Sequence, residues 1–206
     1  MICFCDTDIL LKVIAFDLMT ETLSALGVTP ADVYVTPEAA SKCRRSKHTR
    51  TDFRQEVLDK ALVFLRTVRV ISETGDPDEL EALSGVEGID TGEATLFLAT
   101  KDKTDFLLLT SDKNALRALT DYFLYDDLYE RHVGRVICFE ALLVLIIKRE
   151  GFSKVYPKIR RGQQYDGAVR AAMPGGGATE PDFVRAMEGY VQRLQVETQG
   201  LLVLPS

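Results

Sequence analysis

Apolar residues follow two patterns along the chain, short unbroken runs and longer stretches with a helical period. The short runs are typical of strands buried on both faces, as in the parallel sheet of an α/β domain. They lie at 2–5 (ICFC), 33–35 (VYV), 106–109 (FLLL) and 135–139 (RVICF), with 68–71 (VRVI) as either a strand or a helix end.

The longer stretches alternate with these strands. In DFRQEVLDKALVFL, residues 52–65, the apolar positions recur at the spacing of an amphipathic helix. Helices are expected at 8–26 (closed by Gly27), from near Pro37, and at 52–65, 76–83, 92–102, 112–119 and 140–150. This alternation predicts an α/β domain over residues 1–150, with three layers and a central parallel sheet flanked by helices.

The alternation of short apolar runs and helical stretches ends at Gly151. The segment MPGGGATEPD, residues 173–182, is expected to be a flexible Gly-rich loop. The segment 181–197 has the pattern of a terminal helix that docks either on the domain or on a second subunit. Residues 151–206 are therefore interpreted as a C-terminal extension with helical content.

Composition is that of an ordinary globular protein, with 46% hydrophobic and 27% charged residues. No run approaches ~18 consecutive apolar residues, so no membrane span is expected. The opening segment carries Asp6, Asp8 and Lys12 and has no basic leader, which indicates a cytoplasmic protein rather than a secreted one.

Charge is unevenly spread although the net charge is −6. Residues 42–54 and 148–161 each hold six Lys or Arg against one acid, whereas residues 76–93 hold seven acids and no Lys or Arg. This segregation permits a basic surface beside an acidic pocket, and each basic run alone is equally explained by a solvated helix face.

The four cysteines make no disulfide framework. A zinc site from Cys3, Cys5 and Cys43 would lack the paired Cys-x-x-Cys spacing of common structural sites. We therefore expect these residues to behave as small hydrophobic side chains.

Carboxylates follow two of the predicted strands. Asp6 ends the first strand, with Asp8 two residues later, and Asp112 follows the strand at 106–109. Asp90 and Glu93 open the helix before that strand. Because sites in α/β sheets form outside the carboxyl ends of the strands, these acids would meet if the two strands are neighbours.

Each acid also has a structural explanation. Asp90-x-x-Glu93 is close to a capping box, and Asp6 and Asp112 are each well placed to cap a helix. Ser, Thr or Asn would cap as well, so capping does not require several converging acids. Clustered carboxylates repel one another unless cations neutralise them, and Mg²⁺ and Mn²⁺ prefer such oxygen ligands. Such a site would suit metal-assisted hydrolysis of a phosphate ester.

Three segments, ICFCDTDILL, IDTGEATLFLAT and LLLTSDKNAL, resemble the PIN domain family over roughly residues 1–145. This family includes the VapC toxins of toxin–antitoxin pairs. The resemblance implies an endoribonuclease that needs Mg²⁺ or Mn²⁺, with Asp6, Glu93 and Asp112 as catalytic metal ligands and Asp8 and Asp90 as supporting acids. It also implies a homodimer and an antitoxin-like protein partner.

The chain departs from the family pattern after the second strand, where members commonly carry another acid. Glu38 is the only acid in VTPEAASKCRR, about one turn earlier than expected, and Ser41 and Lys42 occupy the likelier slot. Either Glu38 serves as a metal ligand from the first turn, or the protein lacks this acid and binds metal more weakly.

The remaining candidate residues would act by hydrogen bonds or charge. Thr110, Ser111 and Asn114 are expected to orient ligands or a phosphate. Residues of the first basic run are expected to bind the RNA backbone, namely Lys42, Arg44, Arg45, Lys47 and Arg50.

Two alternatives remain open from the sequence. A haloacid-dehalogenase-like phosphatase would use Asp6 as nucleophile and Asp8 as general acid, but the chain has no later motif of that kind. A catalytically weak PIN-like scaffold would bind RNA or a partner, and the basic stretch 42–54, with His48 and Phe53, would then bind phosphates and stack on a base. His132 carries no signal for either function.

Overall fold

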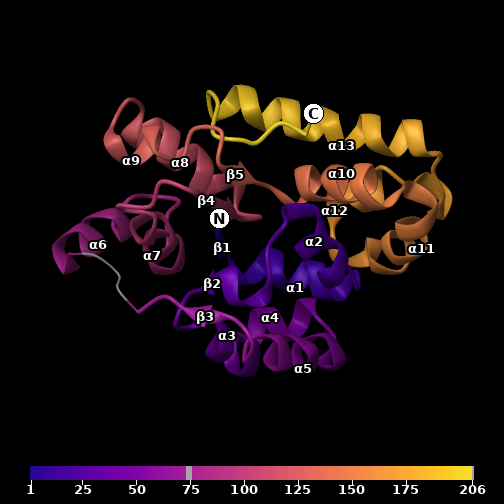
Figure 1. Ribbon diagram of the computed structural model, residues 1–206, viewed down its shortest axis with the longest axis horizontal. Helices are drawn as coiled ribbons and strands as arrows, with labels where there is room; N and C mark the ends of the chain where they lie inside the picture. Colours follow the sequence, from indigo (N-terminus) through magenta and orange to yellow (C-terminus); the bar gives the residue numbers. More distant parts are fainter. Residues whose placement is uncertain (73–75, 206) are drawn as a thin grey trace.

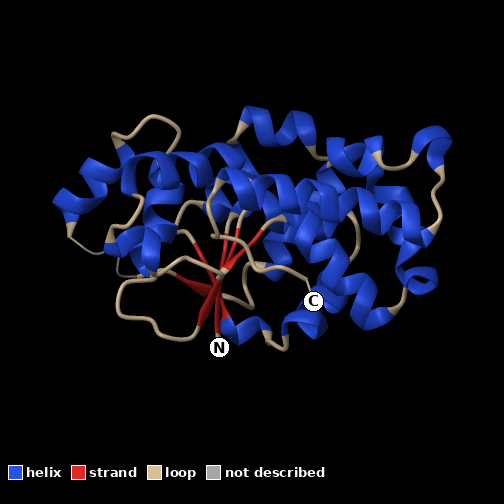
Figure 2. Cartoon of the chain, turned by 90° about the horizontal axis from the view of Figure 1, so that it is seen from above, coloured by secondary structure: helices blue, strands red, loops and turns tan. Residues whose placement is uncertain are grey.

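A five-stranded parallel sheet forms the centre of the computed structural model, which describes residues 1–72 and 76–205. The strands are β1 (Ile2–Cys5), β2 (Val33–Val35), β3 (Arg69–Val70), β4 (Phe106–Leu109) and β5 (Val136–Ile137). Their order is β3-β2-β1-β4-β5, and Figure 2 shows them as a twisted fan with helices around it. The predicted α/β fold with a central parallel sheet is confirmed, and the arrangement is consistent with three layers.

The two strands that were expected to carry the acids are neighbours. β1 pairs in parallel with β4 along its whole length, from Ile2 opposite Phe106 to Cys5 opposite Leu109. Both strands therefore end at the same edge of the sheet, at the centre of the fold. This register brings the segments after Cys5 and after Leu109 together.

Helices connect the strands throughout the domain (Figure 1). Those before β4 are α1 (Thr7–Ala15), α2 (Met19–Leu26), α3 (Ala39–Arg45), α4 (Lys47–Asp52), α5 (Gln55–Phe64), α6 (Pro77–Ser84) and α7 (Thr91–Ala99). Those after β4 are α8 (Lys113–Phe123), α9 (Asp127–Glu130) and α10 (Phe139–Glu150).

The helix predicted at 8–26 is instead two helices, α1 and α2. The chain turns at Asp17, which adopts a left-handed conformation with φ of 58°. The turn leaves Phe16 and Leu18 on either side of it fully buried, which explains why the apolar pattern continues through the break. Gly27 ends α2 in the left-handed conformation, as predicted.

The helix predicted at 52–65 begins later than expected. Residue Phe53 is extended and separates α4 from α5, with its ring buried. Its apolar side chain therefore belongs to the core at a junction, not to the first turn of a helix.

The C-terminal extension consists of α11 (Phe152–Gly162), a 3-10 turn (Gln163–Tyr165), α12 (Gly167–Ala171), a second 3-10 turn (Pro174–Gly176) and α13 (Glu180–Glu197). Helix α13 packs on α10, along one side of the molecule in Figure 1. Its buried residues Phe183, Met187, Val191 and Leu194 join the same hydrophobic core as the sheet. The last residue of the predicted extension, Ser206, lies outside the described residues.

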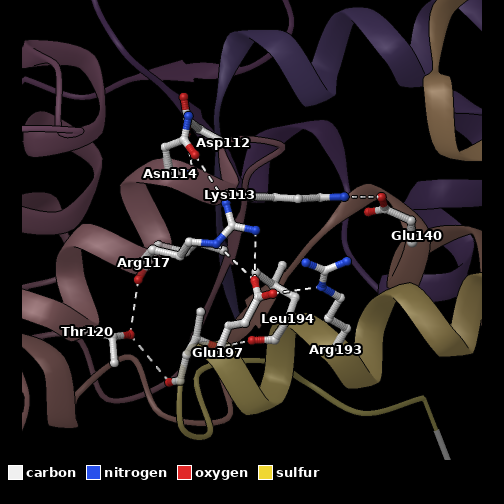
Figure 3. A network of polar contacts seen from close by, with 11 residues as sticks. Asp112, Lys113, Asn114, Arg117, Thr120, Glu140, Arg193, Leu194 and Glu197 are labelled. Atoms are coloured by element: carbon white, nitrogen blue, oxygen red, sulfur yellow. Dashed lines mark hydrogen bonds and ion pairs between the residues drawn. The ribbon is translucent and has the colours of Figure 1, made fainter.

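The end of the chain also touches the sheet and α8. Leu202 makes a parallel bridge to Val136 of β5. Glu197 accepts from Arg117 of α8 at 2.7 Å and from Arg193 at 2.8 Å (Figure 3). The extension thus fixes the helix that begins directly after Asp112.

In the described part of the chain, no helix is both long enough and apolar enough to cross a membrane.

Candidate functional site

Asp6 stands at the exit of β1 and is buried. Its Oδ2 accepts the N–H of Asp8 at 3.2 Å and so caps α1, while its own N–H donates to Leu109 of β4 at 2.9 Å. Burial raises the pKa of the Asp6 carboxyl to about 6, and the negative charge of Asp8 adds to this effect. The carboxyl is thus held in apolar surroundings beside a second acid.

Asp90 and Glu93 form the predicted capping box at the start of α7. Asp90 N–H donates to Glu93 Oε2 at 2.8 Å, and Glu93 N–H donates to Asp90 Oδ1 at 2.9 Å. Burial, the neighbouring Asp90 and the charge of Asp6 together raise the pKa of Glu93 to about 9. Glu93 therefore lies close enough to Asp6 for their charges to interact.

Asp112 caps α8 at the exit of β4. Its Oδ1 accepts the N–H groups of both Asn114 (2.8 Å) and Ala115 (2.9 Å), and its own N–H donates to Thr110 Oγ1 at 3.0 Å. Both capping bonds fall on one oxygen, so Oδ2 has no donor among the described residues. The adjacent Ser111 Oγ is buried and likewise without a partner in the described part of the chain.

A hollow of about 340 Å³ opens beside these strand exits. Its wall combines residues from α1, α4, the β4 exit and the C-terminal extension. The lining residues are Asp8, Lys12, His48, Thr49, Asp52, Phe53, Ser111, Asp112, Gln164 and Tyr165. Asp8 and Asp112 thus face the same space, from the segments that follow two neighbouring strands.

Lys42 enters the acidic group from α3. Its Nζ lies 3.4 Å from Asp8 Oδ1. Burial disfavours its charged form, but the negative charges of Asp6, Asp8 and Asp90 outweigh this and raise the pKa of Lys42. The ammonium group is thus a positive charge built in among the carboxylates.

The other predicted residues divide into two groups. Glu38 is exposed, precedes α3, and makes no capping bond, and neither is it among the residues that line the hollow. The residues predicted to bind the RNA backbone, other than Lys42, are exposed, namely Arg44, Arg45, Lys47 and Arg50. These four are available to a ligand at the surface.

The oxygen atoms of the predicted acidic ligands are of the kind that binds a hard cation, but they do not lie in ligating geometry. Among the described residues, no three His, Cys, Asp or Glu side chains lie close enough together to hold one ion. The fit rests on oxygen atoms that lack a donor, Asp112 Oδ2 and the buried Ser111 Oγ, which face the hollow with Asp8.

The three cysteines weighed for zinc are buried free thiols. Burial raises the pKa of Cys3 to about 12 and that of Cys5 well above its usual range. Because zinc binds the thiolate, these neutral thiols are better explained as core residues.

Two ion pairs beside the hollow could not be predicted from the sequence. Lys12 Nζ lies 2.7 Å from the buried Asp166 of the extension. Lys113 pairs with the buried Glu140 at the start of α10 (Figure 3). The partners are far apart along the chain, so only the fold could reveal them.

The two histidines differ in setting. His48 lines the hollow, is exposed, and has its Nδ1 3.0 Å from Asp52. His132 is fully buried, between Phe97 and Phe106, with Nδ1 2.6 Å from the Leu128 carbonyl oxygen. Burial lowers the pKa of His132 to about 4, so it is a neutral core residue.

Comparison of the chain with protein families, with curated protein sequences and with solved structures finds no match.

Proposed function

We propose that the protein is a metal-dependent ribonuclease with a PIN-like fold, which hydrolyses phosphodiester bonds of RNA with Mg²⁺ or Mn²⁺. The observation that carries the proposal is that Asp8 and Asp112, from the segments that follow the neighbouring strands β1 and β4, line one hollow. The charge of Asp6 contributes to the raised pKa of Glu93, while Asp8 and Asp112 line the hollow.

In this proposal the ligands are Asp6, Glu93, Asp112 and Asp8, which would have to close around the ion, because no three such side chains of the described residues lie in ligating range without it. A bound ion of this kind lowers the pKa of a water and stabilises charge on a phosphate. Capping and binding are compatible at Asp112, because its Oδ1 serves the helix and leaves Oδ2 free of donors among the described residues. The Ser111 hydroxyl supplies a further oxygen, or a hydrogen bond to a phosphate.

The experiment is cleavage of a mixed RNA pool by the parent protein, with Mn²⁺ and with EDTA, and by Asp6→Asn and Asp112→Asn. Asp121→Asn is the matched control, because Asp121 is an exposed acid on α8. We expect the parent and the control to cut with Mn²⁺ only, and the two site variants to be slower by at least about 100-fold, as is usual when a group that stabilises transition-state charge is removed. Equal rates for the site variants and the control would refute the assignment.

A catalytically weak scaffold is the second candidate. It is favoured by Lys42, whose ammonium already pairs with Asp8, and by the lack of three acids in ligating range among the described residues. RNA retained by the parent without any cleavage in Mn²⁺ would favour this candidate.

The biological setting is proposed from the resemblance alone, namely a cytoplasmic toxin that forms a homodimer and is held by an antitoxin-like protein. Growth arrest on induced expression, lost in Asp6→Asn, is the expected result for a toxin. Normal growth with an active purified enzyme would point to RNA processing instead.

A further inference from the structure

Two aromatic rings from distant parts of the chain are stacked beside the hollow. Phe53, between α4 and α5, and Tyr165, in the extension, have ring centroids 5.5 Å apart and planes at 8°. Phe53 is buried, whereas Tyr165 is partly exposed. One ring thus supports the other, which keeps a face or edge of Tyr165 accessible at the surface.

The aromatic pair lies where two hollows meet. Phe53, Tyr165, Asp52 and Gln164 line the hollow that holds Asp8 and Asp112. The same four residues also line a second hollow of about 360 Å³, whose other walls include Arg50 and Arg54. The two hollows therefore adjoin at the aromatic pair, with the acids on one side and two arginines on the other, and together they are called the groove.

The position of Tyr165 is held from two sides. Asp166 is buried, accepts from Lys12 Nζ at 2.7 Å and caps α12 by accepting the Val169 N–H at 3.0 Å. Gly162, at the end of α11, lies so close to the Phe16 ring that a Cβ there would be 2.4 Å from it. The turn that carries Tyr165 is thus fixed to α1 and to the core.

The extension adds charge along the same side. Arg160 and Arg161, with Gln163 and Tyr156, line a third hollow of about 550 Å³ next to the turn at Gln163–Tyr165. None of Arg50, Arg54, Arg160 and Arg161 is paired with a carboxylate of the described residues, and all four are exposed. The two basic runs of the sequence therefore both lie near the turn that carries Tyr165, with Arg50 and Arg54 in the second hollow and Arg160 and Arg161 in the third.

We propose that this groove binds single-stranded RNA, with a base stacked on Tyr165 and phosphates held by Arg50, Arg54, Arg160 and Arg161. A positive groove with an aromatic platform is the usual arrangement for binding a single strand, because an unpaired base exposes its face. A duplex would not bind in this way, because its bases are stacked on one another and leave no face free for Tyr165. The inference rests on the proposed function, since it leads the strand to the acids.

The experiment measures binding of a short fluorescein-labelled RNA of mixed sequence by anisotropy in EDTA, so that cleavage does not enter. Tyr165→Ala is expected to weaken binding by about tenfold, within the range for loss of one stacked base, and Tyr165→Phe to restore it. Arg50→Gln/Arg54→Gln and Arg160→Gln/Arg161→Gln are each expected to reduce the slope of log K against log salt by about 1.4, which is two phosphate contacts. Arg149→Gln/Arg185→Gln is the charge-matched control, because these residues line none of the three hollows.

The outcomes separate this inference from the proposed function. Loss of affinity in the groove variants, with no Mn²⁺-dependent cleavage by the parent, supports the groove and refutes the ribonuclease. Cleavage that depends on Asp6 and Asp112, with unchanged affinity in all groove variants, refutes the groove alone. Duplex RNA bound as tightly as the single strand, or no RNA binding by the parent, would also overturn the inference.

Discussion

Lys42 Nζ lies 3.4 Å from Asp8 Oδ1, at the edge of a group of carboxylates that includes Asp6 and Asp90. A lysine in this place partly neutralises the acids when no metal is bound. It would also compete with a divalent cation for the same oxygens.

Replacement of Lys42 by methionine tests this competition. The metal-free variant is expected to unfold at a temperature lower by about 2–4 °C, because the negative charges of the cluster lose their counter-charge. Mn²⁺ should then raise its melting temperature more than that of the parent, since the ion meets no competing ammonium. Both effects are measured by thermal denaturation with and without Mn²⁺.

The control is Lys47→Met, which removes an exposed lysine of the same basic run. The same response to Mn²⁺ in the parent and in Lys42→Met would show that Lys42 does not compete with metal.

The raised pKa of Glu93, about 9 against a usual 4.5, predicts a pH dependence of stability. The folded state keeps the proton that the unfolded state releases, so stability falls as pH rises from about 4.5 to about 9. Glu93→Gln keeps an acceptor for the capping bond but cannot ionise. We therefore expect the free energy of unfolding in EDTA to fall less for this variant than for the parent between pH 5 and pH 9. The two decreases should differ by more than about 1 kcal/mol.

Urea denaturation across this pH range gives the measurement, with the exposed Glu87→Gln as control. Parallel curves for Glu93→Gln and the parent would mean that Glu93 ionises normally in the folded protein.

Two substitutions of Asp112 should distinguish its structural role, as a helix cap, from its role in RNA cleavage. Asparagine caps a helix as well as aspartate, so Asp112→Asn is expected to change stability by no more than a few tenths of a kcal/mol. Asp112→Ala loses both bonds to Asn114 and Ala115 and should cost about 1 kcal/mol. Both variants should lose RNA cleavage, and urea denaturation with an activity assay distinguishes the two effects. An Asn variant that cuts RNA normally would leave Asp112 as a cap only.

Gly162→Ala is expected to destabilise the protein by about 1–3 kcal/mol, as overpacked core positions do. The reason is the Phe16 ring, whose nearest atom would be 2.4 Å from the new Cβ. Gly189→Ala on α13 is the control, because it meets no atom within 4 Å and should be neutral or stabilising. Similar stabilities of the two variants in urea would show that Phe16 moves aside without cost.

Local patterns were sufficient to predict the sheet and the acids beside it. The runs at 2–5, 33–35 and 106–109 are strands with the predicted bounds, and the expected contact between the first and the last is confirmed. The capping box of Asp90 and Glu93 could be predicted because its two residues are only three positions apart.

The parts that could not be predicted depend on contacts between distant residues. Nothing near Asp17 signals its left-handed turn, because the apolar residues on both sides are needed by the core. Nothing near Tyr165 indicates its stacking on Phe53, and the partners of the ion pair between Lys12 and Asp166 are even further apart along the chain. Helix α11 was missed because it contains Pro157 and follows a glycine.

The stacking of Tyr165 on Phe53 also has a consequence for synthesis. A ribosome adds residues in order, so every acid of the site is made well before the turn that carries Tyr165 and the helix whose Glu197 fixes α8. A nascent chain of about 150 residues would hold the carboxylates but neither the second wall of the groove nor the clamp on α8. In the proposed ribonuclease, the complete groove would thus form only after the turn at Gln163–Tyr165 and α13 have been synthesised, later than the acids of the site.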